Sequence, residues 1–86
     1  MERKSAGDKF VEQTQNSGQF VVYCATEERV IADFDGPNAN TLATESALAH
    51  YASYNTPHVV LLADKKYWKM ERVMPDGQLE VLTNAD

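Results

Sequence analysis

The alternation of apolar and polar positions predicts a strand over residues 19–25, where β-branched and aromatic side chains follow one another. Residues 30–34 alternate in the same way after a polar connection, Thr26–Arg29, of hairpin length. We therefore expect an antiparallel hairpin. The side chains predicted to face the core are Phe20, Val22 and Cys24 on the first strand and Val30, Ala32 and Phe34 on the second.

A break at residues 35–38 separates this hairpin from a helix predicted over residues 40–53. Asn38 or Asn40 is suited to cap it by accepting a bond from an otherwise unpaired backbone N–H. An alanine-rich apolar stripe lets the helix lie close to a sheet, whereas His50 is assigned to the polar side. The stripe consists of Ala43, Ala47, Leu48, Tyr51 and Tyr54.

Three more strands are predicted in the second half of the chain. Residues 58–63 are apolar on both faces, which is typical of a central strand. Residues 67–74 alternate, and residues 78–83 follow a turn at 75–77 in which Gly77 supplies a positive φ. The fold class is α+β: a single antiparallel sheet of about five strands (β-β-α-β-β-β) with one helix packed on one face. The expected core is Phe20, Val22, Phe34, Leu48, Tyr51, Val60 and Leu62.

The N-terminal residues 1–18 carry few apolar side chains and are expected to form a flexible segment. Residues 9–15 fit either a weak edge strand or one or two helical turns, and the turn-forming residues 16–18 favour the strand. Residues 19–83 then form one domain and residues 84–86 a tail. The second sheet face is left partly open, with Val21, Tyr23, Ile31 and either Tyr67 or Trp68 expected there.

The composition of this 86-residue chain, whose net charge is −5, limits where in the cell the protein is expected and what it is expected to bind. The longest apolar run, Val59–Ala63, is far shorter than the about 20 residues that a membrane-spanning helix needs. The N-terminus lacks the apolar segment of a secretion signal. The one cysteine, Cys24, excludes an internal disulfide, so we expect a cytoplasmic protein. The acidic bias disfavours generic nucleic-acid binding.

The residues suited to metal binding or catalysis do not fall into a known motif. Cys24, His50 and His58 are the only thiol and imidazole groups, and no CxxC or HExxH spacing is present. A cysteine within an apolar strand usually behaves as an inert small hydrophobe. We therefore expect no metal site, no cofactor and no enzymatic activity.

Two charged groups offer alternative binding sites. The acidic residues Glu27, Glu28, Asp33 and Asp35, with Tyr67 and Trp68 as aromatic anchors, are suited to a basic protein partner. The basic and aromatic cluster of Lys65, Lys66, Tyr67, Lys69 and Arg72 is suited to single-stranded nucleic acid on a sheet face. A third hypothesis is a homo-oligomeric accessory protein, such as a homodimer, that pairs exposed edge strands. We favour the first, because the chain is acidic overall.

The order of these segments resembles that of small orphan proteins encoded by bacteriophages and prophages. The resemblance spans roughly residues 18–63 and rests on Gly-Gln-Phe-Val-Val-Tyr, Val-Ile-Ala-Asp-Phe-Asp-Gly, the alanine-rich helix and a Val-Val-Leu strand. It carries no site motif. What it implies is a small acidic module in the host bacterial cytoplasm that binds and inhibits or modulates a bacterial protein complex, such as a nuclease, a polymerase or a CRISPR effector.

Overall fold

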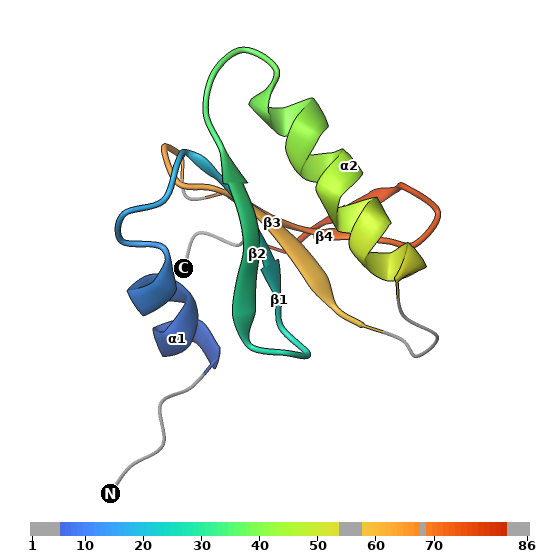
Figure 1. The fold of residues 1–86 in the computed structure, drawn as a ribbon, viewed down its shortest axis with the longest axis horizontal. Helices are drawn as coiled ribbons and strands as arrows, with labels where there is room; N and C mark the ends of the chain where they lie inside the picture. The colour runs from blue at the N-terminus through green and yellow to red at the C-terminus, as the bar shows by residue number, and fades with distance from the viewer. Residues whose placement is uncertain (1–5, 54–57, 68, 83–86) are drawn as a thin grey trace, which may run out of the picture.

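The computed structural model describes residues 6–53, 58–67 and 69–82, the first four of these by their backbone only. The expected α+β class and the single five-stranded antiparallel sheet are confirmed, with strand order β2-β1-β3-β4-β5 (Figure 1). The elements are α1 (Ala6–Gln13), β1 (Phe20–Cys24), β2 (Arg29–Phe34), α2 (Ala39–Ala52), β3 (Val60–Asp64), β4 (Lys69–Val73) and β5 (Leu79–Val81). The expected strand over residues 58–63 is indeed central, since β3 pairs with both β1 and β4.

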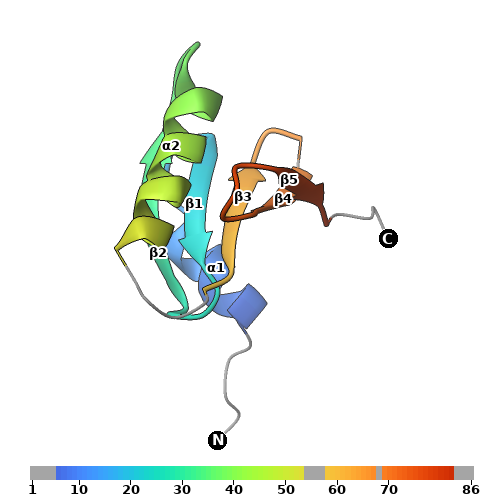
Figure 2. The same cartoon turned by 90° about the vertical axis from the view of Figure 1, so that its right-hand side faces the viewer.

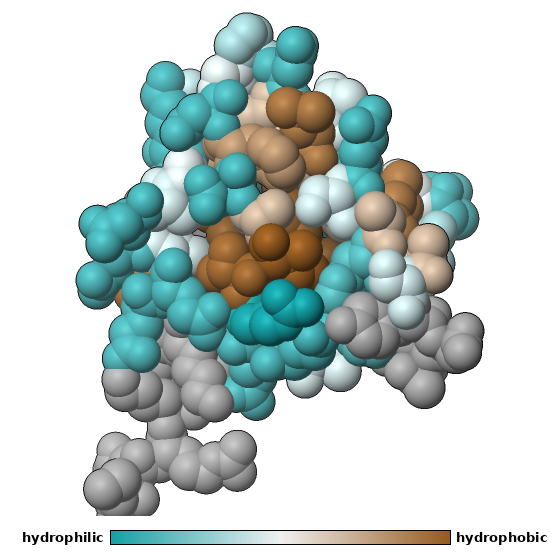
Figure 3. Space-filling view, in the orientation of Figure 1, coloured by the Kyte–Doolittle hydropathy of each residue, from teal (hydrophilic) through white to brown (hydrophobic). Residues whose placement is uncertain are grey.

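The helix α2 covers one face of the sheet, as expected (Figure 2). The cluster buried beneath it consists of Val22, Ala43, Ala47, Val60, Leu62 and Val73. Of the seven expected core residues, Val22, Val60 and Leu62 are buried, whereas Phe20, Phe34, Leu48 and Tyr51 are partly buried and pack against this cluster. The core therefore reaches the surface on this face, which shows an apolar area framed by polar side chains (Figure 3).

Small side chains set the distance between α2 and the sheet. Ala39, Ala43 and Ala47 are fully buried, and Ala43 and Ala47 pack directly in the cluster that the strands contribute. The Tyr51 hydroxyl donates to the Val73 carbonyl and accepts from the Val60 N–H, so it ties the helix to both β3 and β4. Asn38 occupies the N-cap position, but its side chain makes no capping hydrogen bond, so that expectation is wrong.

A β-bulge changes which side chains of β2 face the core. Val22 pairs with Ala32 and Tyr23 pairs with Val30, which leaves Ile31 as the extra residue. Ile31 consequently packs with the α2-side core, and Val30 turns to the opposite face. The expected alternation of β2 is therefore wrong at Val30 and Ile31.

The opposite sheet face is covered by α1, so the strand favoured for residues 9–15 is wrong. Phe10 packs edge-to-face on Tyr23, with ring centroids 5.1 Å apart, and shields Val21. The Gln13 side chain donates to the Glu28 carbonyl (2.9 Å) and accepts from the Val30 N–H (2.8 Å), which occupies the edge of β2. A helix can make both contacts because its 3.6-residue period places Phe10 and Gln13 on the same side, toward the sheet.

The turn before β5 has the positive φ expected of Gly77, which is +92°. We expect Gly77→Val to lower the free energy of unfolding by about 1–2 kcal/mol, because a β-branched residue is strained at positive φ. Denaturant unfolding measures this loss. Gly77→Asn is the matched control and should lose less, since asparagine tolerates left-handed backbone; an equal loss in both variants would contradict the explanation.

Candidate functional site

Four potential ligand side chains meet at one end of the sheet, although the sequence places them far apart. They are Cys24 at the end of β1, Glu27 in the β1–β2 turn, His50 near the end of α2 and His58 just before β3. One ligand atom from each lies within 4.8 Å of the others. The two imidazole rings meet edge-to-face with their centroids 5.5 Å apart.

The local backbone explains how the chain brings three of them together. Residues 25–28 form a tight turn in which the Glu27 N–H donates to the Cys24 Sγ at 3.4 Å. The Ala25 N–H donates to the Val59 carbonyl, and the Val59 N–H donates to the Thr26 hydroxyl, both at 2.8 Å. His58, adjacent to Val59, is thereby fixed beside the turn.

His50 completes the cluster from the buried side of α2, which corrects its assignment to the polar side. It is 7% exposed and continues the buried stripe of Ala39, Ala43 and Ala47 toward the end of the helix. At about 100° per residue, position 50 lies within about 20° of position 43. This angle can be read from the sequence, and it is the signal by which the burial of His50 could have been predicted.

The Glu27 carboxylate is the centre of the cluster. Its Oε1 accepts from the Arg29 Nε at 2.8 Å. Its Oε2 lies 2.9 Å from the His50 Nε2, 3.7 Å from the His58 Nε2 and 3.6 Å from the Cys24 Sγ. Arg29 therefore holds one oxygen and leaves the other directed at the remaining three ligand atoms.

Burial argues against nucleophilic chemistry at Cys24. The side chain is fully buried, and this burial raises the pKa of the thiol. The negative charge of Glu27 raises the pKa further, whereas the hydrogen bond from the backbone N–H of Glu27 lowers it. A thiol with a raised pKa carries little of the reactive thiolate at neutral pH. With no exposed sulfur for a substrate to reach, the cluster is better suited to holding an ion than to catalysis.

The acidic residues proposed for protein binding are separated in the fold. Glu27 belongs to the buried cluster, and Glu28 follows it in the turn. Asp33 and Asp35 lie at the other end of β2, where their carboxylates accept the N–H groups of Gly18 (3.0 Å) and Gln19 (2.9 Å). They form no single acidic face, and Glu27, Asp33 and Asp35 are engaged in contacts within the fold.

The basic cluster is divided in a similar way. The Lys65 Nζ bonds to the Thr14 carbonyl and to the Ser17 carbonyl and hydroxyl, so it fastens the segment after α1 to the sheet. Lys66 lies over the exposed Tyr67 ring, 5.3 Å from its centroid, and Lys69 is 3.8 Å from Glu71. Arg72 faces Glu80 across the β4–β5 ladder. Trp68 lies outside the described residues.

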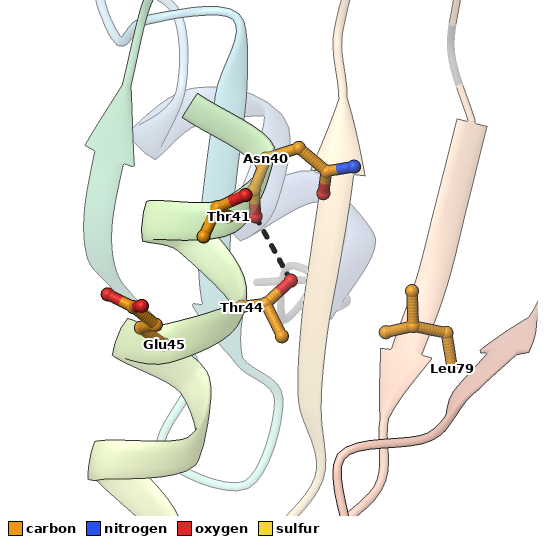
Figure 4. A pocket seen from close by; sticks show the side chains of 5 residues that line it. All are labelled: Asn40, Thr41, Thr44, Glu45 and Leu79. Atoms are coloured by element: carbon orange, nitrogen blue, oxygen red, sulfur yellow. Dashed lines mark hydrogen bonds between the residues drawn. The ribbon is translucent and has the colours of Figure 1, made fainter. Parts of the chain in front are cut away.

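Apart from the residues predicted from the sequence, the structure has two further surface features, the exposed strand β5 and a hollow beside it. All three residues of β5 are exposed. The hollow, of about 250 Å³, lies between the first turns of α2 and Leu79 (Figure 4). It is lined by Asn40, Thr41, Thr44, Glu45 and Leu79.

Comparisons with known proteins give no further guide to the site. No protein-family model, no curated protein and no solved structure matches the chain. Within the described ranges, no helix is long and apolar enough to cross a membrane.

Proposed function

We propose that this protein is a small protein-binding module that binds an extended segment of its partner along the open edge of β5. One observation carries this proposal: β5 is an edge strand on which Leu79 and Val81, together with the adjacent Leu82, are apolar and exposed. The exposed fractions are 42% for Leu79, 60% for Val81 and 43% for Leu82. An exposed apolar edge strand is a template for strand addition.

The direction of the backbone groups supports strand addition at β5. The Gln78 carbonyl accepts from the Met74 N–H just after β4, and the Leu82 N–H donates to the Met70 carbonyl of β4. Backbone groups alternate in direction along an antiparallel strand, so the N–H and C=O groups of Leu79 and Val81 point away from the sheet. At the opposite edge, by contrast, the Gln13 side chain occupies the Val30 N–H of β2 and the carbonyl of Glu28 just before it.

The hollow beside Leu79 offers selectivity to such an edge. Strand addition draws its affinity from main-chain hydrogen bonds and its specificity from pockets for alternate side chains. Four of the five residues that line this hollow are polar, and one of them, Glu45, is acidic. A partner strand that carries a basic or polar side chain above the hollow is therefore favoured over an acidic one.

The finer hypothesis is that the module is encoded by a phage or mobile element and inhibits a bacterial complex in the host cytoplasm. It is supported by the resemblance of residues 18–63 and by the acidity of the chain. The nucleic-acid alternative is less favoured, because Lys65 is engaged inside the fold. Lys66→Glu with Lys69→Glu should then leave partner binding unchanged.

The test is the partner affinity of Val81→Lys, which adds a charge to the proposed binding edge. After capture of a partner from bacterial lysate treated with nuclease, we expect about a 30-fold loss of affinity, equivalent to removing a hot spot of about 2 kcal/mol. Val11→Lys on α1, where valine is 54% exposed, is the matched control and should bind normally. Equal affinities of the two variants, measured by calorimetry, would contradict binding at β5.

Val81→Pro tests the backbone directly. Because the Val81 N–H points outward, proline removes a donor for the partner strand and leaves the β4–β5 bonds in place. Loss of binding in a variant that melts like the parent supports strand addition. If the captured partner is a second copy of this chain, sedimentation will reveal a dimer that Val81→Pro abolishes.

A further inference from the structure

We propose that Cys24, Glu27, His50 and His58 form a structural zinc site. This inference is independent of the binding function proposed for β5, which lies on other residues. The two carry separate tests, so either can fail without the other.

The types of ligand atom match zinc. Zn²⁺ is bound in proteins by thiolate sulfur, imidazole nitrogen and carboxylate oxygen, and structural sites are four-coordinate. The cluster supplies one sulfur, two nitrogens and one oxygen from four different residues. Calcium and magnesium prefer sites made of oxygen ligands alone, so this mixed set selects a transition metal.

The separations of these atoms also fit. Tetrahedral bonds of about 2.0–2.3 Å place neighbouring ligand atoms roughly 3.3–3.8 Å apart. The Glu27 Oε2 lies 3.6 Å from the Cys24 Sγ and 3.7 Å from the His58 Nε2, and 2.9 Å from the His50 Nε2. All four ligand atoms lie within 4.8 Å of one another, so small side-chain rotations complete the geometry.

The charge balance favours an ion at this depth. Cys24 is fully buried, and His50 and His58 are only 7% and 8% exposed. Burying charge is unfavourable unless it is compensated. A thiolate and a carboxylate together neutralise Zn²⁺, so the occupied site adds no net charge to the interior.

The surrounding contacts resemble those that support metal ligands. Arg29 holds the Glu27 Oε1 and thereby fixes the orientation of the carboxylate. The Glu27 N–H donates to the Cys24 Sγ at 3.4 Å and so fixes the position of the sulfur. Outer contacts of this kind orient the ligands and commonly change metal affinity by about 10–100-fold.

An occupied site would join three separate parts of the fold. Cys24 and Glu27 belong to the first hairpin, His50 to α2 and His58 to the segment that enters β3. Coordination would fasten the end of α2 to the sheet, at a point where the helix is otherwise held by Tyr51. Because binding favours the folded state, zinc should raise thermal stability.

Cobalt substitution is the first test, because the chain contains a single cysteine. We expect the chelator-treated full chain to bind one equivalent of Co²⁺ with tetrahedral d–d bands and a thiolate-to-cobalt charge-transfer band, both removed by Zn²⁺. The charge-transfer band can arise only from Cys24. Its absence at saturating Co²⁺ would overturn the proposal, whatever the behaviour of any variant.

Zinc titration with matched variants is the second test. At a free zinc concentration of 100 times Kd, the melting temperature of the parent should rise by about 10–20 °C. Cys24→Ser and Glu27→Gln should each weaken zinc binding by more than about 100-fold, and Arg29→Gln by about tenfold with the charge-transfer band retained. Glu28→Gln, from the same turn but outside the cluster, should bind like the parent. Equal affinity in Cys24→Ser, Glu27→Gln and Glu28→Gln would assign zinc to another place and overturn the proposal.

Discussion

Tyr23→Ala is expected to remove about 3–5 kcal/mol from the free energy of unfolding, which would leave much of the protein unfolded at 37 °C. Tyr23 is 1% exposed and is the largest fully buried side chain among the residues that the structure describes. Truncation of a buried aromatic residue leaves a cavity that the surroundings fill only in part. A chain of 86 residues has a total stability of about 4–13 kcal/mol, so this loss is a large share of it.

The position of Tyr23 adds a second effect. Its ring is the contact for Phe10, so truncation also removes the main apolar anchor of α1 on the sheet. Denaturant unfolding should give the loss, and hydrogen exchange should show that α1 loses protection first. Tyr67→Ala is the matched control, because Tyr67 is 68% exposed and should cost less than about 0.5 kcal/mol. Similar losses for both tyrosines would contradict the packing described for Tyr23.

The strands, the central position of β3 and the main helix could be predicted because each depends on local periodicity. The role of α1 could not be predicted, because it depends on contacts between residues that are far apart in the sequence. Val21 and Tyr23 require a cover on the second face, and Phe10 supplies it from a segment with few apolar residues. The bulge at Ile31 could not be predicted either. The sequence of β2 fits both a regular strand and a bulged one, and only the pairing with β1 decides between them.

The four-residue cluster escaped prediction for a different reason. Known zinc patterns rely on paired cysteines or closely spaced histidines. Here a turn joins Cys24 to Glu27, while one histidine comes from α2 and the other from the segment just before β3. The spacing Cys24-x-x-Glu27 equals that of a CxxC motif once glutamate is accepted as a ligand. That the fold places His50 beside His58 could be learned only from the structure.

Ala47→Leu is expected to lower the free energy of unfolding by about 1–3 kcal/mol and to weaken zinc binding as well. Ala47 is fully buried between α2 and the sheet, in the cluster that contains Val22 and Val60. Three added carbon atoms cannot fit at this contact without moving the helix. His50 lies three residues further on the same buried face, so a displaced helix also moves its imidazole away from Glu27.

Measuring the unfolding of Ala47→Leu with and without zinc separates these two effects. The loss of packing should appear in chelator, and a further difference from the parent should appear when zinc is added, because the displaced helix binds the ion less tightly. Ala49→Leu, an exposed position on the same helix, is the matched control and should change stability by less than about 0.5 kcal/mol. If Ala47→Leu retains the zinc affinity of the parent while losing stability, the helix has repacked without moving His50. If it loses neither, α2 does not lie against the sheet through its alanine side chains.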